Sequence, residues 1–160
     1  KFFIQMYNEN TVFKSRDELI DQLAEVLFDA GYVRDGFSAA VKQRESTLPT
    51  GLRLPSGINV AIPHTEASYV ETTGIVFALL KSPVVFHEMV EPSQQVNVQL
   101  VMLLAVAEPQ AQVKTLRKIM SLLQDESTMK QLLDKMDVSE IERILEQIFK
   151  GENNGSNETD

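Results

Sequence analysis

The segment Val96–Ala105 constrains the fold more than any other part of the chain, because it is almost continuously apolar. Its central part, Leu100–Leu104, contains no polar residue, yet the segment is too short to span a bilayer. A strand of this kind is typical of the middle of a sheet that is covered on both faces. Two further strands are predicted at Val60–Ile62 and Ile75–Leu80, with a polar excursion at 83–95.

Segments with helical periodicity lie on both sides of these strands. A short strand within Lys1–Phe13 is followed by Ser15 and Glu18, which predict a capping box: the Ser15 hydroxyl accepts from the Glu18 amide, and Glu18 reaches back. Gly31 is expected to end this helix in the left-handed conformation. A second helix is predicted at Gly36–Glu45.

We take Asp35 as the cap of that second helix, and we expect a shaped loop at 46–57. From Gln110 onward the apolar residues again follow a helical period, through three more helices. The pattern predicts one α/β sandwich in which helices flank the strands, with a domain at 1–150. The last residues, 151–160, are polar and are predicted to form a disordered tail.

Composition narrows the classes of function. The chain of 160 residues has no cysteine, so disulfides and thiolate metal sites are excluded, and a cytoplasmic location fits. Its formal charge of −8 and the absence of a cluster of Lys and Arg argue against nucleic acid as a partner. No apolar stretch is long enough to insert into a membrane.

The most informative single residue is His64, which follows Pro63 at the end of the strand at 60–62. Proline lacks an amide hydrogen, so the strand is expected to stop there and to deliver the imidazole at its end. Thr65 and the small residues nearby are expected to leave the ring accessible. Imidazole is a nitrogen nucleophile that titrates near neutrality, which suits covalent group transfer. A lone histidine beside an apolar run also has a purely structural interpretation.

Other interpretations of the polar residues are weaker. The spacing of His64 and His87 matches no recognised zinc site. Glu45 and Glu66 are carboxylates that could complete a metal site near His64, but the spacing argues against one. No metal or other cofactor is expected. A hydrolase would need a nucleophile elbow around serine, and the sequence has no G-x-S-x-G motif. His87 is expected to have a surface or structural role.

Arg44 follows the apolar face of the second predicted helix, formed by Phe37, Ala40 and Val41. One interpretation is that the side chain snorkels at the helix end, where a cation also suits the helix dipole. The other is that Arg44 has a functional role. The pattern alone leaves both open.

Several short motifs, taken together and in order, resemble a known family. They are Arg44-Glu45, Pro49-Thr-Gly-Leu52, Ala61-Ile-Pro-His64, Pro83-Val-Val-Phe86 with Met89, Leu103-Leu-Ala105 and Leu116-Arg-Lys-Ile119. Between Val12 and Ile148 the chain resembles the enzyme IIA domains of the bacterial sugar phosphotransferase system (PTS). The resemblance is to the mannitol/fructose type and is greatest to galactitol-type members.

The resemblance implies a fold with a central mixed β-sheet and a phosphocarrier function. His64 would accept a phosphoryl group from the phosphohistidine of the protein HPr and pass it to a cysteine of enzyme IIB, in the uptake of a sugar or sugar alcohol. Arg44 would neutralise the phosphoryl oxygens, a role that suits a guanidinium that stays charged.

The resemblance also implies supporting roles. Thr50 and Gly51 could supply hydroxyl and backbone N–H donors, and a role in forming the turn is an equal alternative. Many family members carry a second histidine just before the helix at 113–123, where this chain has Gln112. A glutamine amide can donate to a phosphoryl oxygen or orient the His64 ring, but it cannot change charge.

A second function is a phosphorylation-dependent regulatory module. The resembled family includes domains fused to transcription regulators, in which phosphorylation controls partner binding. The chain has no DNA-binding segment, but it starts without a methionine, so a domain excised from a larger regulator is also an expectation.

Overall fold

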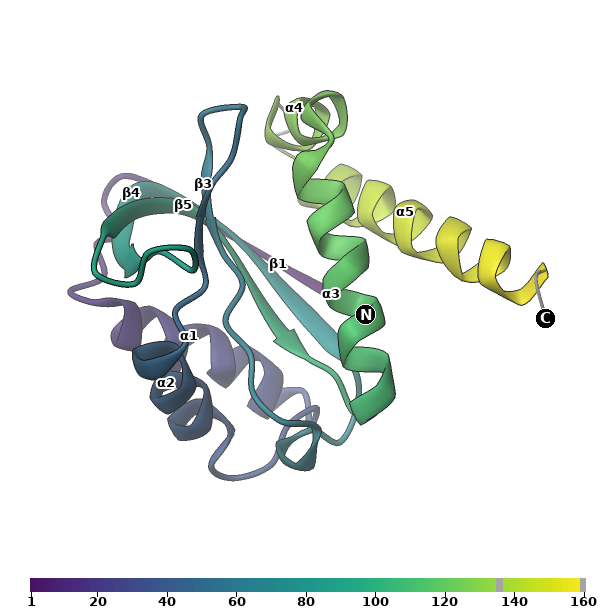
Figure 1. The fold of residues 1–160 in the computed structure, drawn as a ribbon, viewed down its shortest axis with the longest axis horizontal. Coiled ribbons are helices and arrows are strands. Elements are labelled where there is room, and N and C mark those ends of the chain that lie inside the picture. The colour runs from purple at the N-terminus through teal and green to yellow at the C-terminus, as the bar shows by residue number, and fades with distance from the viewer. Residues whose placement is uncertain (135–136, 159–160) are drawn as a thin grey trace.

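The computed structural model describes residues 1–134 and 137–158, and a five-stranded mixed sheet lies at the centre of this part (Figure 1). The strand order is β1 (Phe2–Tyr7), β4 (Gly74–His87), β5 (Gln95–Ala105), β3 (Asn59–Ala61) and β2 (Gly51–Arg53). Strand β5 pairs antiparallel with β4 and parallel with β3. The apolar segment that the sequence places in the middle of a sheet is therefore its central strand.

Helices cover both faces of the sheet (Figure 1). Helices α1 (Arg16–Asp29) and α2 (Phe37–Thr47) cover one face, and a short 3-10 helix, Ala67–Tyr69, lies in the loop before β4. The other face carries α3 (Pro109–Gln124), α4 (Glu126–Asp134) and α5 (Val138–Glu158). The predicted α/β sandwich with a mixed sheet is confirmed.

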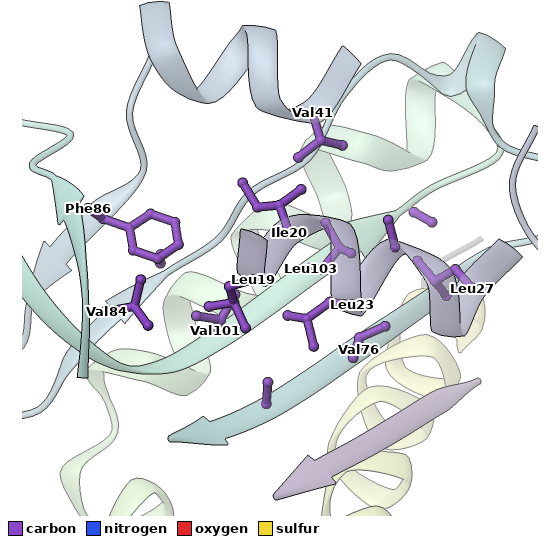
Figure 2. Packing of buried hydrophobic residues seen from close by; sticks show 14 of the residues in the cluster. Leu19, Ile20, Leu23, Leu27, Val41, Val76, Val84, Phe86, Val101 and Leu103 are labelled. Atoms are coloured by element: carbon purple, nitrogen blue, oxygen red, sulfur yellow. The ribbon is translucent and has the colours of Figure 1, made fainter. Parts of the chain in front are cut away.

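The two faces have separate apolar cores because neighbouring residues of a strand point to opposite sides. In β5, Val101 and Leu103 pack toward α1 and α2, while Leu100 and Met102 pack toward α3 and α4. Figure 2 shows the first core, in which the apolar stripe of α1 lies over the strands. Burial of this kind contributes about 1.5–3 kcal/mol for each large side chain.

The ends of α1 follow the predicted signals with one difference. The Glu18 amide donates to the Ser15 hydroxyl at 3.2 Å, as a capping box requires. The Glu18 carboxylate accepts instead from the Lys14 amide at 2.7 Å, one residue before the expected donor. Gly31 has φ +79° and takes the left-handed position after the helix.

The start and end of α2 differ from prediction. The residue that caps it is Gly36, with φ +90° and no side-chain cap, so the prediction of Asp35 as the cap is wrong. The helix then runs to Thr47, beyond the predicted end at Glu45. Glycine has no side chain, so the residue at the cap position cannot accept from the first amides of the helix.

One strand is longer than predicted, and one was not predicted. Strand β4 continues to His87 through an irregularity between Leu79 and Val84, so the first part of the predicted polar excursion, 83–87, is strand. Pro83 is tolerated because a bulge leaves positions without a ladder hydrogen bond. The loop predicted at 46–57 contains β2, a short strand that pairs antiparallel with β3.

At the C-terminus the backbone of α5 is helical to Glu158, whereas the sequence predicts a disordered tail at 151–160. Residues 159–160 and the side chains of 151–158 lie outside the described residues. The division into a domain at 1–150 and a tail stays a prediction. Among the described residues, no helix is long and apolar enough to cross a membrane.

Candidate active site

A pocket of about 420 Å³ lies where the loop after β3 meets the C-terminal end of α2 and the middle of α3. Its lining brings together three residues singled out from the sequence: His64, Arg44 and Thr50. The remaining lining is mostly apolar: Thr47, Leu48, Pro49, Ile62, Met89, Pro92, Leu116 and Met120. Ligand sites of α/β proteins are commonly found beyond the ends of strands in this way.

His64 reaches this pocket because β3 ends at Ala61 and Pro63 prevents a further strand residue. His64 as a residue is 9% exposed, so the expectation of an accessible ring is only partly met: the residue is buried, but it borders the pocket. Leu116 and Met120, apolar residues of α3, line the same pocket.

One ring nitrogen of His64 has a fixed partner. Its Nδ1 lies 2.7 Å from the Ile62 carbonyl oxygen. A carbonyl only accepts, so Nδ1 carries the proton and the neutral ring keeps its lone pair on Nε2. The geometry therefore selects Nε2 as the nucleophilic atom.

The environment also keeps this ring neutral. Burial lowers the pKa of His64 below its ordinary value, and the positive charge of Arg44 lowers this pKa further. The hydrogen bond to the Ile62 carbonyl acts in the opposite direction and raises the pKa. The net lowering leaves an unprotonated imidazole available at neutral pH.

Arg44 lies in the last turn of α2, half-buried at the pocket wall. Its Nε is buried and has no hydrogen-bond partner among the described residues. A buried donor of a guanidinium without a partner is costly unless an anion satisfies it. Arg44 and His64 together thus provide a cation and a nucleophile around one space.

Thr50 and Gly51 have structural contacts. The Thr50 amide and hydroxyl both donate to the carboxylate of Glu45, at 2.7 and 2.9 Å, which favours the second of the two roles considered for Thr50. A Cβ on Gly51 would lie 2.5 Å from the His87 carbonyl oxygen and 2.5 Å from Val96 Cγ1. Glycine is therefore needed here for close approach of the β4–β5 hairpin.

Gln112 lies in the first turns of α3, next to the same loop. Its side-chain nitrogen donates to the Thr65 carbonyl at 2.5 Å, one residue after His64. Of the two roles considered for the glutamine amide, this contact supports the one in which it orients the segment that carries the imidazole.

His87 is at the end of β4, and its Nδ1 lies 2.7 Å from the Pro92 carbonyl oxygen across the hairpin. This bond fits the predicted surface or structural role. Among residues 1–134 and 137–158, no group of three His, Cys, Asp or Glu side chains is placed to hold a metal ion.

Comparison with known proteins bears on the resemblance found in the motifs. The model of the family described as "Phosphoenolpyruvate-dependent sugar phosphotransferase system, EIIA 2" matches residues 4–148. The chain belongs to this family. The EIIA proteins of this family are phosphotransferase components that carry a phosphohistidine, so the chain is a phosphocarrier of a sugar PTS.

Individual relatives agree with this assignment. The galactitol-specific EIIA component of the PTS of Escherichia coli K12 is 31% identical over 121 residues, 76% of this chain and 79% of that protein. The transcriptional regulator ManR of Bacillus subtilis is 32% identical over 140 residues, 82% of this chain but 20% of the regulator.

A solved structure shows the same fold. The complex of enzyme IIAMTL with phosphorylated enzyme IIBMTL from E. coli matches with a TM-score of 0.64 and 22% identity, over 91% of this chain and 94% of that one. The mixed sheet and its two helical layers are therefore those of a type-2 PTS EIIA protein.

From the sequence, Glu45 was noted only within the Arg44-Glu45 motif and as a metal ligand, and its buried hydrogen bonds with Thr50, a residue of the pocket, were missed. The buried face of α2 is Phe37, Val41 and Glu45, spaced four residues apart, whereas Arg44 lies beside that face at the pocket. This spacing was a usable signal, because a carboxylate at the next position of an apolar stripe must have partners in the interior.

Proposed function

We propose that His64 is the phosphoacceptor of this EIIA protein, taking the phosphoryl group from the phosphohistidine of HPr and passing it to a cysteine of enzyme IIB. The observation that carries the proposal is that one pocket is lined both by His64, whose protonated Nδ1 leaves the lone pair on Nε2, and by Arg44, whose Nε has no partner in the described part of the chain. The family assignment supplies the reaction class, and the geometry supports the choice of residue.

The proposed chemistry is two in-line transfers. The Nε2 lone pair attacks phosphorus, the P–N bond to the HPr imidazole breaks, and that imidazole leaves with the bonding electron pair and takes up a proton. In the second transfer a cysteine thiolate of IIB attacks the phosphorus, and the electron pair of the breaking bond returns to Nε2. Such reactions need positioning and charge neutralisation, which Arg44 supplies in this proposal.

The rim of the pocket suits transient docking of two protein partners. Leu48 and Met89 line the pocket and are 55% and 40% exposed, and Val90 next to Met89 is 85% exposed. Val113, beside Gln112 on α3, is also exposed. Apolar residues gathered around a reactive group are typical of interaction surfaces. The relative solved with phosphorylated IIBMTL supports IIB as a partner. In this proposal both exchanges take place in the cytoplasm.

Incubation with phosphoenolpyruvate, enzyme I and HPr tests the proposal directly. We expect the intact protein to gain the mass of one phosphoryl group, in an acid-labile bond, and to lose it when a matching IIB is added. The control reaction omits HPr and should leave the mass unchanged. An unchanged mass in the complete mixture would contradict the proposed function.

The pH dependence provides a second test. The pKa of His64 lies below 6.5, its ordinary value, so lowering the pH to 6.5 leaves the folded ring mostly neutral and nucleophilic. We therefore expect phosphoryl acceptance to persist at pH 6.5 and to fall only when the pH drops through the lowered pKa. Titration of the His64 ring by NMR measures this pKa, and a midpoint above 6.5 would contradict the expectation.

A regulatory module is the second candidate, and the similarity to ManR favours it. In that case phosphorylation of His64 would change binding to a regulatory protein instead of feeding a transporter. Transfer assays with a panel of IIB proteins distinguish the two. Rapid loss of the phosphoryl group to one IIB supports transport, and a stable phosphoprotein that binds a regulator supports control.

A further inference from the structure

Glu45 is one of the few residues with an ionisable side chain that are buried in the part of the chain that the structure describes. The residue is 2% exposed, and both of its oxygens accept hydrogen bonds from Thr50, at 2.7 Å from the amide and 2.9 Å from the hydroxyl. Arg16 from α1 and Arg44 from its own helix are the cations that act on it. Burying a carboxyl group is costly unless it is bound in this way.

The Thr50 hydroxyl connects this carboxyl group to the chain just before His64. The Thr50 hydroxyl donates its one proton in the hydrogen bond to Glu45, so the lone pairs of Oγ1 are left to accept a hydrogen bond from another group. The Ile62 amide donates to this oxygen at 3.0 Å. Strand β3 ends at Ala61, so Thr50 provides the partner for an amide one residue beyond the strand.

Ile62 is held at its carbonyl as well as at its amide. The carbonyl oxygen lies 2.7 Å from His64 Nδ1, and the next carbonyl, that of Pro63, accepts from the Leu104 amide at 3.0 Å. Fixing the amide and the carbonyl of one residue fixes its φ and ψ. The direction of the Ile62 carbonyl, which selects the tautomer of His64, is therefore set at its amide end by Thr50.

We propose that Glu45 and Thr50 are positioning residues that act through the Ile62 backbone to hold His64 as the Nδ1–H tautomer, with Nε2 facing the pocket. The inference deepens the proposed function, on which it rests, because it assigns these residues a role in the reaction without contact with the phosphoryl group. If the hydrogen bonds from Glu45 through Thr50 to Ile62 served only to join α2 to the end of β3, they would stabilise the fold without affecting the tautomer of His64.

The test is NMR of the ring nitrogens of His64, in protein labelled with nitrogen-15, above the pKa of the ring. Thr50→Val keeps the side-chain volume but removes the hydroxyl. We expect the ratio of the Nδ1–H to the Nε2–H form to fall about fivefold, which corresponds to the loss of one neutral hydrogen bond. Thr50→Ser retains the hydroxyl and should restore the wild-type signals.

Thr73→Val is the matched control. The Thr73 hydroxyl also accepts from a backbone amide, that of Ala107 at 3.0 Å. This bond involves none of Glu45, Thr50 and Ile62. This variant should leave the ring signals of His64 unchanged. Wild-type ring signals in folded Thr50→Val protein would overturn the inference.

Glu45→Gln provides a second variant in case Thr50→Val does not fold. An amide has only one accepting oxygen, so one of the two Thr50 donors loses its partner. We expect a shift of the tautomer ratio in the same direction as for Thr50→Val, and an unchanged ring in the folded variant would also overturn the inference.

The ring measurement needs no phosphoryl donor, so its result is separate from that of the phosphorylation assay. A wild-type protein that takes no phosphate but whose tautomer depends on Thr50 would contradict the proposed function alone. Phosphorylation of His64 with a tautomer indifferent to Thr50 would contradict the inference alone.

Discussion

Replacing His64 with glutamine is expected to abolish phosphoryl acceptance. The glutamine amide can still donate to the Ile62 carbonyl and fills a similar volume, so the surrounding loop should keep its conformation. Its nitrogen lone pair is delocalised into the carbonyl and cannot attack phosphorus. Intact mass after incubation with phosphoenolpyruvate, enzyme I and HPr should show no phosphorylated species.

The control for this result is His87→Gln. His87 also has its Nδ1 at 2.7 Å from a backbone carbonyl, that of Pro92, and removing it therefore tests whether any histidine with such a contact accepts the group. This variant should be phosphorylated like the wild type. A phosphorylated His64→Gln protein would show that another residue is the acceptor.

Replacing Arg44 with alanine should have the second-largest effect. The charge on the transferring group develops beside His64, where the Arg44 Nε has no partner among the described residues. Removing a preorganised donor of this kind typically costs about 10²–10³ in rate. We expect a loss of this size in single-turnover transfer from phosphorylated HPr, with a smaller loss for Arg44→Lys, which keeps the charge but not the planar fork.

Lys42→Ala is the matched control on the same helix. Lys42 is a cation of α2 that pairs with Asp21 at 2.9 Å, away from the pocket residues. Its removal should change neither the rate nor the far-UV circular dichroism of the protein. If a folded Arg44→Ala variant transfers the phosphoryl group at the wild-type rate, the functional role of Arg44 is contradicted. Arg44 would then only snorkel at the end of α2.

Much of this fold could be predicted because its signals are local. The apolar run of β5 and the Ser15 cap of α1 each reflect a property of neighbouring residues, and both appear in the structure. The position of His64 was predictable for the same reason, because Pro63 ends the strand by its own covalent structure.

The features that were missed depend on residues far apart in the sequence. Strand β2 has weak strand signals of its own and exists because it pairs with β3, while β4 extends past Pro83 because β5 continues beside it. The pocket that His64 borders is lined in part by Leu116 and Met120 of α3, more than forty residues later in the chain. No local pattern encodes such contacts.

Arg44 lies on α2 and Gln112 lies on α3, and these two helices cover opposite faces of the sheet. The pocket is thus a seam between two separately packed halves of the molecule. We therefore expect a compound that displaces α3 from the sheet to change the surroundings of His64 without contacting the imidazole, because α3 lines the pocket and Gln112 holds the Thr65 carbonyl.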